Sequence, residues 1–249
     1  MKSDNFKAYS KYYDLLYSNK NYEAEVKYID KLVKKYSPNA VDVLEFGSGT
    51  GKHGILLSAM GYEVFGIERS EEMVEKARES SFPCIAGDLT STVLNKKYDV
   101  VLSLFHVISY LNDNSSLIAA FKNAHLHLKK DGIFIFDVWY TPSVRQVKPE
   151  ARVKEVENTS IKVIRFANPE VKSQENVINV NYTVLVNDKT TGSWDELTEV
   201  HPMRHFCIPE IDLLCKMNGF VILKTEEFIS GNEPSDLTWA VNFIVKKNE

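Results

Sequence analysis

A strand, a glycine-rich turn and a helix follow one another near the start of this chain, and no other stretch constrains its fold more strongly. The apolar run 41–46 predicts a buried strand, and a helical pattern begins at residues 52–60 after Gly47, Gly49 and Gly51. Together they open a βαβ unit, in which glycines let a ligand approach the backbone and helix-start N–H groups face it. The natural ligand of such a turn is a nucleoside-bearing cofactor.

Two classes of cofactor compete for this turn. Gly49, Gly51 and Gly54 satisfy the dinucleotide spacing G-x-G-x-x-G, and the acidic Glu68 follows at the expected distance. That motif places its first glycine directly after the strand, however, and here Glu45 stands just ahead of the glycine in that place. A carboxylate there repels a pyrophosphate and attracts a cation. The pattern therefore favours the ammonium and sulfonium of S-adenosylmethionine and leaves two alternatives: an NAD-dependent oxidoreductase and a structural turn without a ligand.

Residues 45–51 resemble the glycine-rich first motif of the class I S-adenosylmethionine-dependent methyltransferases. The resemblance covers the whole chain and implies an α/β fold with a Rossmann-like seven-stranded sheet, mostly parallel with an antiparallel last strand. It implies an enzyme that uses S-adenosyl-L-methionine to methylate a small-molecule acceptor, although a non-catalytic cofactor-binding protein could share the fold. We expect the cofactor to contact Tyr13, Glu45, Gly47, Gly49, Gly51, Glu68, Arg69, Asp88, Leu89, Leu104 and Phe105.

Two acidic residues follow the next predicted strands. Glu68 ends the strand 62–67, where its carboxylate can accept both ribose hydroxyls of an adenosine, a role that either cofactor would need. Asp88 follows the short strand 83–86 and can accept a hydrogen bond from the adenine amino group, while Leu89 donates its backbone N–H to the ring. A Gly-Asp turn alone is common, but in series with the first motif it supports an adenosine site.

The fourth predicted strand, residues 98–104, leads into a segment that contains His106, Ser109 and Tyr110. In open α/β sheets the carboxyl end of such a strand faces the ligand, so these side chains should lie near the methyl group. An amine acceptor needs only to be unprotonated, whereas a hydroxyl acceptor needs a base. We nominate His106 as that base, because the ordinary pKa of histidine suits the task, and Tyr110 as the residue that orients the acceptor. Both could instead be satisfied core residues.

The N-terminal segment 6–18 is dense in tyrosine and precedes an amphipathic helix that Pro38 closes. Tyrosine-rich segments often serve as hydrophobic cover with hydrogen-bonding tips. In the resembled family a Tyr-Asp pair in this segment covers the cofactor, and Tyr12, Tyr13 and Asp14 occupy the matching place. The resemblance makes Tyr13 the expected cofactor contact.

The pattern changes after the fifth predicted strand, residues 133–138, and the aromatic pair Trp139 and Tyr140. The pair can wall a substrate pocket or stabilise a sulfonium by cation–π contact. Residues 151–206 alternate apolar and polar side chains in three strings separated by an Asn-Pro turn and an Asn-Asp-Lys-Thr-Thr-Gly turn. This pattern predicts an antiparallel meander that sits over the active-site end as a substrate lid.

The remaining residues return to the main domain. Residues 208–218 predict a helix that ends at a glycine, and two strands, 220–228 and 237–245, should complete the sheet. We therefore expect two parts. Residues 1–142 and 207–249 form the S-adenosylmethionine-binding domain with an N-terminal helical cover, and residues 143–206 form the inserted lid.

A narrower and looser likeness connects the chain with nucleotide-linked amino-sugar N-methyltransferases of the desosamine and mycaminose type. It is carried by the N-terminal tyrosines, the first glycine motif, the aromatic residues after the fifth strand, the meander and the helix that follows residues 203–206. Those enzymes carry a histidine followed by a leucine after the fourth strand, whereas this chain has Tyr110 and Leu111 there. The acceptor implied by the likeness is the nitrogen or oxygen of a nucleotide-linked sugar.

Composition narrows the partners and the compartment. The formal net charge of −4 gives no support for a nucleic-acid partner. Three cysteines without a C-x-x-C spacing, a start without a signal-peptide pattern and the lack of a long apolar run predict a cytoplasmic protein without a membrane span. We expect no metal, because Pro202 and a strand context argue against a pair formed by His201 and His205. More simply, Arg204 and His205 should line one end of the meander. The sequence specifies no oligomeric state.

Overall fold

Seven strands form the central sheet of this protein, whose structure, a computed structural model, describes residues 10–248. Their order is β3-β2-β1-β4-β5-β11-β10. The first five are parallel, and β11 runs antiparallel to both neighbours. The predicted mostly parallel sheet with an antiparallel last strand is confirmed. The strands are β1 (Asp42–Phe46), β2 (Glu63–Glu68), β3 (Cys84–Ala86), β4 (Tyr98–Ser103), β5 (Leu128–Tyr140), β10 (Phe220–Glu227) and β11 (Ala240–Lys247).

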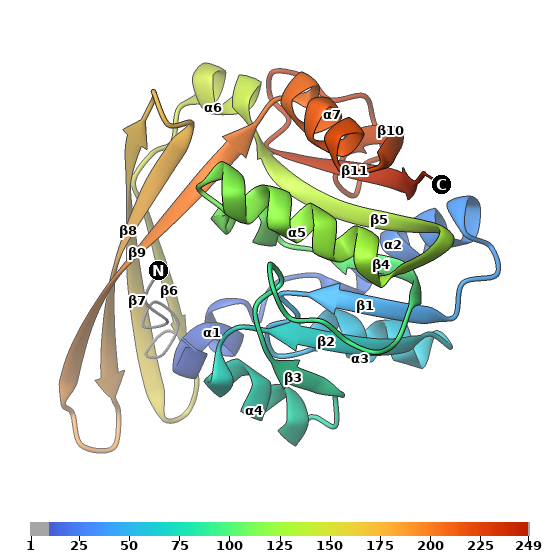
Figure 1. The fold of residues 1–249 in the computed structure, drawn as a ribbon. Coiled ribbons are helices and arrows are strands. Elements are labelled where there is room, and N and C mark those ends of the chain that lie inside the picture. Colours follow the sequence, from blue (N-terminus) through green and yellow to red (C-terminus); the bar gives the residue numbers. More distant parts are fainter. Residues whose placement is uncertain (1–9, 249) are drawn as a thin grey trace.

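Helices cover both faces of this sheet because its strands are apolar on both sides. On β5, Ile133 and Ile135 face one layer of helices, and Phe134 and Phe136 face the other. In Figure 1, α5 lies in front of the sheet and α3 behind it. None of the described helices is long and apolar enough to cross a membrane. The face with Ile133 and Ile135 packs against α2 (Tyr22–Tyr36), α3 (Lys52–Ala59) and α4 (Glu71–Glu79). The face with Phe134 and Phe136 packs against α5 (Asn114–His127) and α7 (Ile208–Met217).

A four-stranded antiparallel meander follows β5 and the short helix α6 (Thr141–Val147). The sequence predicted the meander but not α6. Its last strand pairs in parallel with the end of β5, at Trp139 with His205 and Tyr140 with Phe206. The meander is therefore hydrogen-bonded to the central sheet and stands along one side of it (Figure 1). Its strands are β6 (Arg152–Glu157), β7 (Ile161–Lys172), β8 (Val177–Asp188) and β9 (Trp194–Phe206).

The Asn-Pro turn predicted inside the meander is wrong. Asn168 and Pro169 lie within β7, and the chain turns later, next to Asn176, which has a φ of 53°. Strand β6 accompanies β7 only as far as Ala167. Beyond it β7 is an edge strand, where proline is tolerated because one side of the backbone has no strand to pair with.

The N-terminal helix α1 (Ser10–Leu16) packs on the meander. Leu16 is completely buried in a cluster with Val163 and Val184, and the exposed fraction of Tyr13 is intermediate. Residues 6–9 of the tyrosine-dense segment lie outside the described residues. The predicted N-terminal cover thus contacts both the meander and the cleft described next.

Candidate active site

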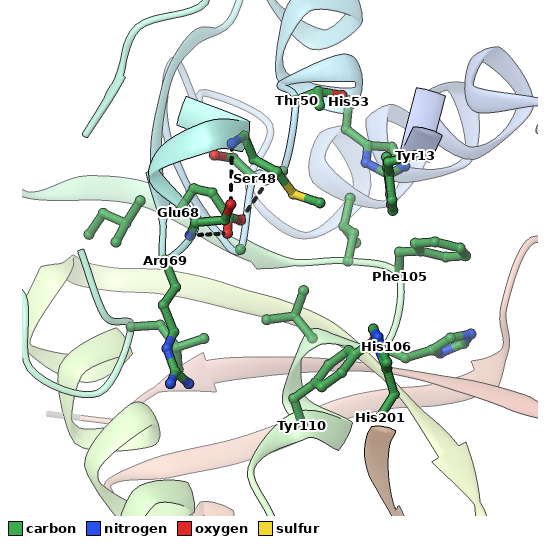
Figure 2. Close-up of a pocket in the computed structure, with 18 of the residues that line it drawn as sticks. Tyr13, Ser48, Thr50, His53, Glu68, Arg69, Phe105, His106, Tyr110 and His201 are labelled. Carbon is green, nitrogen blue, oxygen red and sulfur yellow. Dashed lines mark hydrogen bonds between the residues drawn. The ribbon is translucent and has the colours of Figure 1, made fainter. Parts of the chain in front are cut away.

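A cleft of about 260 Å³ opens at the carboxyl ends of β1, β2, β3 and β4 and is closed by α1 and the inner side of the meander. Figure 2 shows Glu68 and Arg69 at one end, Phe105 and His106 at the other, and Tyr110 beside His201. Two predicted site residues, Glu45 and Gly51, do not line it. The residues that do are Tyr13, Gly47, Gly49, Glu68, Arg69, Asp88, Leu89, Leu104, Phe105, His106 and Tyr110.

The glycine turn shapes the floor of the cleft. Gly47 has a φ of 68°, and a Cβ added there would lie 2.6 Å from the side chain of Val107. Gly49 also has a positive φ, and its N–H donates to Glu68 Oε2 at 2.9 Å. Gly51 lies behind the wall, where an added Cβ would meet the ring of Phe82 at 2.6 Å. The backbone conformation and the packing of the turn are therefore enough to require glycine.

Two carboxylates lie at the end of the cleft where the sequence predicts the nucleoside. Glu68 accepts backbone hydrogen bonds from Gly49 and from Ser70, at 2.9 and 2.8 Å. Burial raises the pKa of Glu68, and these hydrogen bonds oppose the shift. Asp88 accepts hydrogen bonds from the N–H and the hydroxyl of Thr90. Acceptor oxygens at the ends of two adjacent strands fit the hydroxyl and amino donors of an adenosine, so the residues present suit the expected cofactor.

Glu45 lies beneath the wall rather than in it. Its side chain is 2% exposed, and the nearby His53, which does line the cleft, has its Nδ1 3.6 Å from Oε1. Burial raises the pKa of Glu45 to about 8. At neutral pH the carboxyl is therefore mostly protonated in the ligand-free protein, and its selection of a cationic ligand stays a prediction.

A buried ionic cluster that the sequence did not predict lies at the start of α2. Glu25 Oε2 lies 2.5 Å from Lys20 Nζ and 2.7 Å from His53 Nε2. The Lys20 ammonium also lies over the rings of Tyr22 and Phe105, at 4.0 and 4.1 Å from their centroids. Burial lowers the pKa of Lys20, although Glu25 opposes the shift. His53 and Phe105 are far from Lys20 and Glu25 in sequence, so no local pattern could have indicated the whole cluster.

A sharp turn after β4 presents His106. Phe105 and His106 are consecutive non-glycine residues with φ near 63°, a conformation that costs free energy and is concentrated at functional sites. The backbone N–H of His106 donates to Asp137 Oδ2 at 3.1 Å, and its Nδ1 lies 2.6 Å from the same oxygen. Asp137 is completely buried on β5. Trp139 also lines the cleft, 6.0 Å from the His106 ring, whereas its predicted companion Tyr140 packs against the core.

Tyr110 lies on the short 3-10 helix η2 (Val107–Tyr110) and meets the meander. Its hydroxyl lies 3.0 Å from His201 Nδ1, and His201 Nε2 lies 2.9 Å from Glu199 Oε2. His205, by contrast, bonds to Thr141 outside the cleft, and burial lowers its pKa to about 4. Among the described residues no group of three or more His, Cys, Asp and Glu side chains could hold a metal ion.

Comparison with known proteins agrees with this geometry. A family model described as a methyltransferase domain matches residues 17–180. The Bacillus subtilis protein YqeM, named as a methyltransferase without a stated substrate, is 27% identical over 256 residues and 98% of each chain. The Streptomyces venezuelae dTDP-3-amino-3,4,6-trideoxy-alpha-D-glucopyranose N,N-dimethyltransferase is 31% identical over 134 residues, 52% of this chain and 56% of that one. A crystal structure of an S-adenosylmethionine-dependent methyltransferase from Clostridium acetobutylicum superimposes with a TM-score of 0.81 at 20% identity, covering 98% of both chains.

The seven-stranded sheet, the cleft at the carboxyl ends of its strands and the family match define the class of S-adenosylmethionine-dependent methyltransferases. The chain belongs to the methyltransferase-domain family. S-Adenosylmethionine is its cofactor, and the oxidoreductase alternative finds no support among these relatives.

Proposed function

We propose that this methyltransferase transfers a methyl group to the nitrogen or oxygen of a small molecule, and that the acceptor is a nucleotide-linked amino sugar. The observation that carries the proposal is the second end of the cleft. There Tyr110, Tyr182 and His201 enclose a space between the sheet and the meander. A concave site of this size with polar side chains suits a small molecule better than a nucleic acid or a protein segment. The matching region of the S. venezuelae relative belongs to an amino-sugar methyltransferase.

Different residues would hold the cofactor and the acceptor. When bound, S-adenosylmethionine supplies a methyl group on a positively charged sulfur. Glu68 and Asp88 would hold its adenosine. The cofactor would also lie against the backbone of the turn at Gly47 and Gly49. We further propose that residues 143–206 act as the acceptor wall. The protein then contributes mainly proximity and alignment.

A proton must leave the acceptor when it is a hydroxyl or an ammonium. We propose that His106 takes this proton, because its Nδ1 lies 2.6 Å from Oδ2 of the buried Asp137, whose carboxylate would stabilise the imidazolium that forms. Asp137 was not singled out in the sequence. It completes an imidazole–carboxylate pair at the reaction end of the cleft.

The acceptor is tested with methyl-labelled cofactor. The purified protein would be incubated with panels of nucleotide-linked sugars, simple amines and carboxylates, including dTDP-3-amino-3,6-dideoxy-alpha-D-glucopyranose, the compound in the name of a Streptomyces fradiae relative. We expect the label in a nucleotide-linked amino sugar. Transfer to nucleic acid or protein instead would contradict the proposed partner.

The cofactor assignment has its own measurement. Calorimetric titration should show binding of S-adenosylhomocysteine and none of NAD. Tight binding of NAD without binding of the thioether would restore the dinucleotide interpretation of Gly49, Gly51 and Gly54.

A further inference from the structure

Three side chains from the meander and the short helix η2 form a hydrogen-bonded chain at the acceptor end of the cleft. Glu199 and His201 come from β9, and Tyr110 comes from η2 (Figure 2 shows the last two). The Glu199 and His201 side chains are only 7% and 2% exposed. The Tyr182 ring meets the His201 ring edge-on, with centroids 4.8 Å apart. The imidazole is therefore held on both sides and has one orientation.

The chemistry of the three groups fixes the direction of the chain. An ionised carboxylate can only accept hydrogen bonds, so the proton of a neutral His201 belongs on Nε2, facing Glu199. In that tautomer Nδ1 is an acceptor, and the Tyr110 hydroxyl, 3.0 Å away, would donate its hydrogen to it. Burial raises the pKa of Tyr110 well above its ordinary value, so the phenol keeps that hydrogen. The Tyr110 oxygen can then act toward other groups as a hydrogen-bond acceptor.

We propose that Glu199 and His201 make Tyr110 Oη a hydrogen-bond acceptor toward the methyl acceptor, so that the cleft selects N–H and O–H groups, ammonium included, and rejects carboxylates. The inference rests on the proposed small-molecule methyl transfer and adds a rule of specificity to it. Tyr110 contacts the acceptor, while Glu199 and His201 are positioning residues that act through it. A carboxylate would place its own lone pairs against those of the phenol oxygen, which is repulsive.

The hydrogen-bonded chain could also serve only as a clasp, a structural link that holds β9 and η2 together. The direction of its hydrogen bonds separates the two roles. A clasp needs the two hydrogen bonds in either direction. Selection of donors needs the proton on His201 Nε2. The first experiment therefore records long-range nitrogen correlations of the histidines in the full-length enzyme saturated with S-adenosylhomocysteine, with His201 assigned by its loss in His201→Gln. We expect a protonated Nε2 and a bare Nδ1. A proton on Nδ1, alone or together with Nε2, would overturn the inference.

The second experiment measures steady-state kinetics for the acceptor, with the compound of the panel that the enzyme methylates. Tyr110→Phe removes the oxygen, and Glu199→Gln lets an amide donate to Nε2 and so reverse the chain. We expect kcat/KM for the acceptor to fall roughly 10- to 100-fold in both variants, mainly through KM, because a donor on the acceptor loses its partner. Affinity for S-adenosylhomocysteine should stay within twofold. An acceptor kcat/KM that is unchanged within twofold in both variants would overturn the proposal.

Matched controls separate this effect from the loss of any buried polar pair. Tyr62→Phe removes a hydroxyl that donates to Asp30, and Glu226→Gln changes a buried carboxyl that accepts from Tyr28, both outside the cleft. Neither should change acceptor kinetics.

The outcomes also distinguish this inference from the proposed function. If no member of the panel is methylated, the proposed acceptor class fails, and the nitrogen signals of His201 alone decide the inference. If a carboxylate proves the best substrate, methyl transfer stands and the donor rule is overturned.

Discussion

Phe105 and His106 hold the most informative backbone in the cleft, because two successive left-handed residues that are not glycine fix where the imidazole points. Asparagine tolerates this conformation better than alanine. His106→Asn therefore removes the imidazole with little added strain. We expect turnover at saturating cofactor to fall about 100-fold or more, with unchanged binding of S-adenosylhomocysteine by calorimetry. Turnover within a few-fold of the original would remove His106 from the role of base.

Glu45 gives the protein a pH-dependent stability. Its pKa is raised by burial from 4.5 to about 8, so the folded state holds this proton more tightly than the unfolded state does. The stabilisation is complete below pH 4.5 and is lost as pH rises toward 8, by several kcal/mol at most. We expect Glu45→Gln to flatten this part of the stability curve in denaturant titrations of the ligand-free protein. The same fall in the variant would show that other groups cause it.

At the scale of single elements, the β1–α3 turn depends on its first glycine for two reasons. Gly47→Ala would meet both the strain of a positive φ and the side chain of Val107, whereas an added Cβ at Gly61, with a φ of 101°, meets nothing within 4 Å. Strain alone costs about 1–2 kcal/mol. Gly61→Ala should therefore lower the melting temperature without changing cofactor binding. Gly47→Ala should lower it further and weaken S-adenosylhomocysteine binding at least tenfold by calorimetry; equal affinities in the two variants would contradict this account.

Elements defined by local sequence were predictable, and those defined by pairing at a distance were not. The strand, turn and helix around Gly47, and Glu68 and Asp88 after their strands, follow from patterns a few residues long. Asp137 acquires its role only through the neighbouring β4, which brings His106 against it. His201 faces the cleft only because β9 continues past Pro202 and joins β5. The position of Glu45 behind His53 was likewise set by packing in three dimensions.

At the scale of the whole molecule, α1 ties the two parts of the site together. Leu16 is completely buried against the meander, while Tyr13 and Tyr17 on the same segment line the cleft. Leu16→Ala should lower the free energy of unfolding by about 2–4 kcal/mol and raise KM for the acceptor more than it weakens cofactor binding. Leu237, which is 71% exposed, provides a control whose change to Ala should alter neither quantity. Equal losses of stability and of acceptor affinity in Leu16→Ala and Leu237→Ala would mean that α1 does not connect the two parts of the site.

The pairing of β9 with the end of β5 has a thermodynamic consequence. The pairing of Trp139 with His205 and of Tyr140 with Phe206 joins the meander to the central sheet through the backbone. Heat should therefore unfold the meander and the central sheet in one cooperative step. A calorimetric scan should give a single peak whose van't Hoff and calorimetric enthalpies agree. Two resolved peaks would mean that the meander melts independently of the sheet that carries it.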